Sequence, residues 1–396
     1  MLARSLTHPA PSQPAALPLL AKGFRPFFLL AALQAVVTLP IWLAVLSGWG
    51  PDLPLGPMVW HAHEMVFGFT VAVIAGFLLT AAGNWTGRET ARGPALAGLC
   101  VLWLVGRVAC LVDAPPLLGA LACASFYVAL GVALGRPLLA AKNRRNYGLL
   151  LIVLALGACD AATHLGALMP ERGLSRLAPL WAVDLVVVMM VLVSGRIVPM
   201  FTRNALGDPR IVNEPWLDRG ALAACVLAAA CGVLLRDVRV TAAVSLLAGV
   251  FVLARARRWG GHRTLGHPLL WILHAGHAFI AVGLLLRAAS GLIGGVPSGA
   301  TLHALTAGAI GCLTLGMMSR VTLGHTGRML AAPTGMSIAF AAVALGATVR
   351  ILAPLTPSAQ LPLLVLGGGA WSLGFLGFLL TQAPMLARSR VDGRPG

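Results

Sequence analysis

The sequence predicts an all-α, polytopic integral membrane protein: a bundle of about twelve transmembrane helices with both termini in the cytoplasm. Three observations carry this prediction. Hydrophobic residues make up 58% of the 396 residues and charged residues only 10%, whereas a soluble domain carries about 25% charged residues. The mean hydropathy is +0.88. Apolar runs of about twenty residues, the length that a spanning helix needs, recur along the whole chain.

Twelve apolar segments account for the predicted spans. Many begin with proline, whose missing N–H costs nothing in the first turn of a helix. The runs are rich in Ala and Leu and lack the alternation of a membrane β-strand. In chain order they are Pro26–Leu46, Met58–Gly83, Pro94–Val112, Pro116–Gly135, Gly148–Gly166, Pro179–Gly195, Gly220–Leu235, Val240–Ala254, Pro268–Ala289, Gly299–Ser319, Pro333–Ala353 and Leu361–Thr381.

These segments divide the chain into a transmembrane domain over residues 26–384 and two short cytoplasmic ends, residues 1–25 and 385–396. Segments seven and eight are short, and charged residues between them predict a tight helical hairpin. Pro199, shortly after segment six, predicts a helix stop, because the residue before a proline is pushed out of the helical region.

The formal net charge of +17 reflects loop positions rather than a nucleic-acid partner. When the helices alternate across the membrane, 22 of the 29 Lys and Arg residues fall on one side and 7 on the other. Short basic loops stay in the cytoplasm. The basic residues are scattered over many loops and form no single patch, which argues against nucleic acid.

Polar residues inside the predicted spans indicate a functional site, because ionisable groups in a membrane are costly. Four histidines and three carboxylates converge on the outer end of the bundle from four helices: His61, His63, Glu64, Asp160, His164, Asp184 and His303. Neutral imidazole is a ligand for copper, iron and zinc, so this group predicts a metal site. The alternative is a set of interfacial histidines that reach the lipid headgroups.

Spacing within this group suggests individual roles. Asp160 and His164 are four residues apart and share a helix face, so Asp160 is predicted to orient the His164 ring. Glu64, three residues after His61, is predicted to do likewise or to carry protons. His61 and His63 are two apart and point in nearly opposite directions on a regular helix.

A second group lies toward the cytoplasmic side. His274 is the deepest candidate ligand there, and together with His325 it would complete a second site. The seven cysteines all lie in apolar runs without a C-x-x-C pair. They are interpreted as small buried hydrophobes, with neither a disulfide framework nor a thiolate metal site.

Several of these motifs resemble the NnrS family. The match includes Trp-His-Ala-His-Glu-Met and Arg-Val-Thr-Leu-Gly-His-Thr-Gly-Arg, and it extends over nearly the whole chain. It runs through Lys22–Phe28, Trp60–Met65, Ala75–Thr80, Asn84–Arg88, Gly195–Asn204, Leu273–Gly276, His303–Gly311 and Ser319–Arg328.

The resemblance implies a bacterial inner-membrane protein that contains haem b and copper and takes part in the response to nitric oxide and nitrosative stress. His61, His63, His164, His274, His303 and His325 match positions where the family is expected to have histidine. His277 departs from that pattern, because an aromatic residue is more usual there. The absence of a Cys-x-x-Cys-His motif excludes covalently attached c-type haem.

The sequence does not assign individual histidines to haem or copper. The outer group has enough imidazoles for copper or for a haem with two histidine ligands, but not comfortably for both. His325 is either a ligand or part of a basic turn that binds an anion such as a haem propionate. Arg196, Arg320 and Arg328 are candidates for propionate or lipid contacts.

The predicted partners are the lipid bilayer, a small gas such as nitric oxide and a membrane electron donor. A proton-coupled secondary transporter is the alternative function. It would use Glu64, Asp160 and Asp184 as a proton relay.

Overall fold

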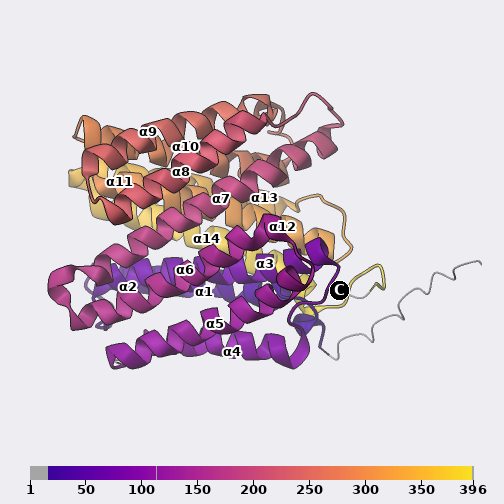
Figure 1. Cartoon of the computed structure of the whole chain (residues 1–396), viewed down its shortest axis with the longest axis horizontal. Coiled ribbons are helices and arrows are strands. Elements are labelled where there is room, and N and C mark those ends of the chain that lie inside the picture. Colours follow the sequence, from indigo (N-terminus) through magenta and orange to yellow (C-terminus); the bar gives the residue numbers. More distant parts are fainter. Residues whose placement is uncertain (1–16, 113, 395–396) are drawn as a thin grey trace, which may run out of the picture.

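The computed structural model describes residues 17–112 and 114–394, and every regular element in them is helical. Eleven helical stretches of this part are long and apolar enough to cross a membrane, and the 17-residue apolar helix α4 (Gly93–Ala109) lies between the second and third of them. The predicted twelve-helix bundle is therefore confirmed (Figure 1). Part of the predicted N-terminal segment, residues 1–16, lies outside the described residues, and the cytoplasmic placement of both ends stays a prediction.

The helices follow the predicted segments closely. They are α1 (Phe24–Leu46), α2 (Pro57–His63), α3 (Val71–Thr86), α4, α5 (Pro116–Ala140), α6 (Tyr147–Leu165), α7 (Leu174–Leu206), α8 (Pro215–Leu234), α9 (Val238–Arg255), α10 (Pro268–Leu292), α11 (Ser298–His303), α12 (Gly311–His325), α13 (Thr334–Leu352) and α14 (Gln360–Ala387). Proline occupies the first turn of α4, α5 and α10, as the sequence predicted, and also of α2 and α8. The helix α7 begins before Pro179, which lies inside it.

Two spans contain a π-helical segment directly after a histidine. Glu64–Thr70 joins α2 to α3 after His63, and Ala304–Ile310 joins α11 to α12 after His303. A π-segment widens the helix locally and is frequent at functional sites. These two segments therefore mark the second and tenth spans as the functional part of the bundle.

Three spans form the centre of the bundle. The most buried are α2–α3, α11–α12 and α7, which are the second, tenth and sixth spans. The other helices surround them, and α1 packs against α14, α5 against α6 and α9 against α10. A central helix thus recurs at every fourth span.

The predicted helix stop at Pro199 is wrong, because α7 continues to Leu206 and ends at Gly207, whose φ is +61°. Pro199 has no N–H to offer to the carbonyl of Gly195. The side chain of Asn213 donates to that carbonyl instead, at 2.7 Å. A proline is tolerated within a spanning helix when another group satisfies the freed carbonyl.

Both described ends of the chain lie at the same end of the bundle. The Arg25 guanidinium donates to the carbonyls of Leu386 and Arg388, at 2.8 and 2.6 Å. An even number of spans requires this arrangement. In Figure 1, α2 and α11 lie at the left end of the bundle and the C-terminus at the right end.

Candidate metal centre

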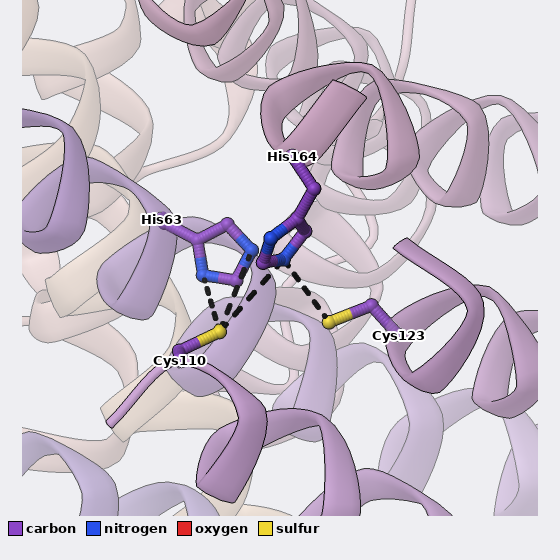
Figure 2. A group of neighbouring side chains, drawn as sticks. All are labelled: His63, Cys110, Cys123 and His164. Atoms are coloured by element: carbon purple, nitrogen blue, oxygen red, sulfur yellow. Dashed lines mark hydrogen bonds between the residues drawn. The ribbon is translucent and has the colours of Figure 1, made fainter. Parts of the chain in front are cut away.

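Two histidines and two cysteines from four helical segments face one another inside the bundle (Figure 2). His63 ends α2, Cys110 follows α4, Cys123 lies on α5 and His164 lies near the end of α6. All four are buried. We call this group the His/Cys cluster. No other group of three or more histidine, cysteine or acidic residues with a metal-like spacing occurs in the described residues.

The donor atoms of the cluster have the spacing of a metal coordination sphere. Cys110 Sγ lies 3.5 Å from His63 Nδ1 and 3.9 Å from His164 Nε2, and Cys123 Sγ lies 3.5 Å from His164 Nε2. Tetrahedral zinc with bonds of about 2.1–2.3 Å would separate its ligand atoms by roughly 3.6 Å. The residues present therefore fit a four-coordinate metal. Thiolate and imidazole ligands select Cu(I) or zinc.

Two carboxylates hold the His63 ring. Its Nε2 lies 2.8 Å from Asp160 Oδ1, and its Nδ1 lies 3.0 Å from Glu64 Oε1. Tyr127 donates its hydroxyl to the other oxygen of Asp160, at 3.1 Å. A carboxylate on the far nitrogen of a histidine ligand is the usual way to fix its orientation. Nε2 bound to Asp160 leaves Nδ1 as the nitrogen for a metal, with Glu64 as its competitor.

An arginine and a glutamine complete the surroundings of the cluster. Arg107 Nη1 donates to Glu64 Oε1 at 2.7 Å, while its Nη2 lies 3.8 Å from Cys123 Sγ. Gln34 on α1 donates to the second oxygen of Glu64. Arg107 thus places a positive charge between a buried carboxylate and a sulfur, which offsets part of the cost of burying negative groups.

Glycines and a tryptophan set the positions of the cluster residues. A Cβ on Gly119 would lie 2.7 Å from His164 Nδ1, and one on Gly68 would lie 2.7 Å from the Gln34 amide nitrogen. Only glycine allows these approaches. The Trp60 indole donates to the carbonyl of Cys110 at 3.1 Å and ties the end of α4 to α2.

The structure divides the predicted outer group into separate places. His63, Glu64, Asp160 and His164 lie at the cluster. His61 and His303 line a different cavity, described below. Asp184 lies at neither, because it pairs with Arg287 at 2.7 Å.

The predicted carboxylate pairings also change. Asp160 and His164 share a face as expected, but Asp160 lies 3.8 Å from His164 Nε2 and 2.8 Å from His63 Nε2. Its closer partner is therefore on another helix. Glu64 likewise contacts His63 and Arg107 rather than His61. The spacing of residues along one helix identifies neighbours on that helix. It does not identify a closer partner on a neighbouring helix.

His274 and His325, the second predicted site, have different neighbours in the structure, and their joint role stays a prediction. His274 Nε2 lies 2.9 Å from the Thr202 hydroxyl, whereas the His325 ring packs on Phe24 with centroids 5.5 Å apart. Both nitrogens of His277 have partners, Ser194 at 3.2 Å and the carbonyl of Val252 at 3.0 Å. Hydrogen bonds within the bundle therefore occupy both nitrogens of His277.

The three predicted anion-binding arginines lie away from the cluster. Arg196 donates to Asn146 at 2.8 Å, and Arg320 lies over the Phe201 ring at 3.9 Å from its centroid. Arg328 donates to the carbonyl of Thr326 at 3.4 Å. Their roles toward lipid or propionate stay predictions.

Sequence reasoning missed several residues of the cluster. All seven cysteines are free, as predicted, but Cys110 and Cys123 are not merely small hydrophobes, because both face two histidines. A cysteine in an apolar run gives no sign of its neighbours. Arg107 was the available signal, since a basic residue within an apolar helix requires a buried partner.

The fold and the cluster define a polytopic helical membrane protein with a candidate metal centre enclosed by its helices. The family model described as NnrS protein matches residues 18–390. The chain therefore belongs to the NnrS family. No curated protein matches the sequence.

Proposed function

We propose that this chain is a haem- and copper-containing protein of the bacterial inner membrane that acts in the response to nitric oxide. Family membership supports this proposal, and the His/Cys cluster is the observation that carries it. The cluster brings two imidazoles, two thiols and two carboxylates within hydrogen-bonding distance. Burying so many polar groups in a membrane costs free energy, which indicates a function.

We place copper at the cluster, with His63, Cys110, Cys123 and His164 as its ligands. A bound copper would supply a redox-active centre that binds a diatomic gas. Soft thiolates favour copper over the hard cations magnesium and calcium. The surrounding helices exclude water from the site, and the positive charge of Arg107 offsets the negative charge of the ligands.

The carboxylates around His63 have two roles in this proposal. Asp160 holds the ring so that Nδ1 faces the sulfurs, and Tyr127 holds Asp160. Glu64 lies on the other side of the ring, between Gln34 and Arg107. When Nδ1 binds copper, Glu64 gives up its contact with the ring and stays beside the metal, held by Gln34 and Arg107, where its carboxylate suits the delivery of protons to a bound gas.

The transporter alternative is less well supported. Its proton relay would need Glu64, Asp160 and Asp184 together, but Asp184 pairs with Arg287 outside the cluster. Many transporters consist of two similar halves. Here a central helix recurs at every fourth span rather than every sixth.

Purification from a copper-replete host, followed by metal quantification and a reduced-minus-oxidised optical spectrum, tests the proposal. We expect copper near one equivalent per chain and the absorption bands of b-type haem. Nitric oxide added to the reduced protein should shift those bands or change the copper spectrum. A protein that contains neither haem nor copper would overturn the proposal, and so would zinc alone.

A further inference from the structure

A second site lies beside the His/Cys cluster. A cavity opens between α1, α2–α3, α11–α12, α13 and α14, and its walls are mostly apolar. Its charged or ionisable lining residues are His61, His303 and Arg350. The cavity thus combines an apolar interior with two imidazoles and one guanidinium, which come from three different spans.

The His303 ring has one nitrogen engaged and one nitrogen free. Its Nδ1 lies 2.7 Å from the carbonyl of Gly299, so Nδ1 carries the proton and donates it. Nε2 then keeps its lone pair and has no hydrogen-bond partner among the described residues. A backbone carbonyl on the far nitrogen is the arrangement that fixes a metal-binding histidine.

The His61 ring is held by stacking instead. It lies against the Trp42 indole with centroids 3.9 Å apart and planes 17° apart. Neither of its nitrogens bonds to a residue that the structure describes. The Trp42 indole N–H is itself buried without a hydrogen-bond partner. Both side chains thus present unused polar groups at the cavity.

Arg350 lacks the acidic partner that two other arginines within the spans have. Arg107 pairs with Glu64 and Arg287 pairs with Asp184, at 2.7 Å in both cases. Arg350 lines the cavity and makes no ion pair with any acid of residues 17–112 and 114–394. An unpaired cation among apolar helices is costly, so the cavity is suited to a ligand that carries an anion.

We infer that this cavity is the haem site, where His61 and His303 would bind the haem iron and Arg350 would pair with a haem carboxylate. The inference rests on the proposed function, which supplies haem as the cofactor. The cavity meets each chemical need of b-type haem: imidazole ligands without a covalent link, apolar walls for the macrocycle and a cation for its acid groups.

Small residues give this cavity its shape. Gly346, Gly367 and Gly368 line it where α13 meets α14. A Cβ on Gly346 would lie 2.7 Å from the carbonyl of Gly367, so these helices touch through their backbones. The absence of side chains there leaves a smooth wall, which suits a flat ligand.

Variants of the two histidines test the assignment. The purified wild type and the His61→Ala and His303→Ala variants are compared by pyridine haemochrome content, electron paramagnetic resonance and copper content. We expect low-spin haem in the wild type. Each variant should lose most of the haem or convert it to a high-spin form, and should keep its copper. Added imidazole should restore the low-spin signal of the His303→Ala protein.

His277→Ala is the matched control, because His277 is another histidine within a span, lies outside the cavity and has both ring nitrogens hydrogen-bonded. It should keep full haem content and an unchanged spectrum. The Arg350→Gln protein should lose haem to an apomyoglobin scavenger about tenfold faster than the wild type, because the haem carboxylate loses its cationic partner. Removal of such a supporting group typically costs about 10- to 100-fold.

The outcomes separate the assignment from the proposed function. A wild type without haem overturns both. Unchanged low-spin haem in the His61→Ala and His303→Ala proteins overturns the assignment alone. The assignment also fails if the Cys110→Ser protein loses haem while the two histidine variants keep it. A quinone extracted from the wild type in stoichiometric amount and lost from the His61→Ala protein would also overturn it.

Discussion

His61 and His63 lie two residues apart on α2 and face different sites. The His61 ring stacks on Trp42 with centroids 3.9 Å apart, whereas His63 Nε2 lies 2.8 Å from Asp160 on α6. Successive positions on a helix are about 100° apart, so residues two apart point in nearly opposite directions. One short helix therefore provides an imidazole to each of two neighbouring sites, and a substitution at one site should leave the other intact.

Cys110→Ser and Cys123→Ser should each lower copper occupancy while leaving haem content unchanged. A serine hydroxyl is a hard donor and a poor substitute for a soft thiolate. Inductively coupled plasma mass spectrometry on purified protein measures the copper. Cys100→Ser is the matched control, since Cys100 lies on α4 outside the cluster. Full copper content in both cluster variants would contradict the prediction.

Asp160→Asn should weaken copper binding about 10- to 100-fold, the usual loss when the partner of a histidine ligand is removed. The amide keeps the size of the side chain but removes its charge. Titration against a chelator of known affinity gives the dissociation constant. Tyr127→Phe should show a smaller loss, because it acts on His63 only through Asp160. Asp52→Asn, on the exposed loop before α2, serves as the control. An Asp160→Asn protein with wild-type copper affinity would remove this carboxylate from the site.

Gly119→Ala should disturb the cluster and destabilise the protein by about 1–3 kcal/mol, a typical cost of overpacking. The new Cβ would lie 2.7 Å from His164 Nδ1 and would push that ring away from Cys123. Gly98→Ala on α4 is a matched control with open space around the added carbon. It should stabilise the helix by about 0.5–1 kcal/mol. Thermal unfolding and copper content together check both variants, and equal behaviour of the two would contradict the packing argument.

The loop after α7 gives a prediction about pH. The guanidinium of Arg210, followed by that of Arg263, holds the pKa of Asp208 below its ordinary value. A lowered pKa in the folded state means that the contribution to stability is present above the unfolded pKa of about 3.9. It is lost as the pH falls through the folded pKa. Asp208→Asn should therefore lower the unfolding temperature at pH 6, but not at a pH below the folded-state pKa of Asp208, where the wild-type carboxyl is also uncharged. An unchanged difference between the two proteins at every pH would exclude this role.

The sequence predicts much of this architecture because the membrane imposes it. Spanning helices need long apolar runs, and the twelve runs appear directly in the residue order. The same constraint makes His63, Glu64 and Asp160 conspicuous, since charged groups are rare among lipid-facing residues. For this reason the residue order alone reveals the polar core of the cluster.

Contacts between helices are less accessible to sequence reasoning. Cys110 and Cys123 resemble the other five cysteines, and only the packing of α4 and α5 against α2 and α6 distinguishes them. The cation at the second site, Arg350, lies far along the chain from His61. Helical periodicity predicts which residues share a face of one helix. It does not predict which face of another helix packs against them.

Pro199 and Asn213 offer a test of how the longest helix is held together. Asn213→Ala should destabilise the protein by about 1–3 kcal/mol, because it leaves the carbonyl of Gly195 without its donor. Pro199→Ala should be mild by itself, since the new N–H and the Asn213 side chain then compete for one carbonyl. In the double variant the helix supplies its own hydrogen bond, so the cost of Asn213→Ala should largely vanish. Unfolding free energies of the four proteins in detergent form a double-mutant cycle. If the two changes are additive, Asn213 stabilises α7 by some route other than the carbonyl that Pro199 leaves free.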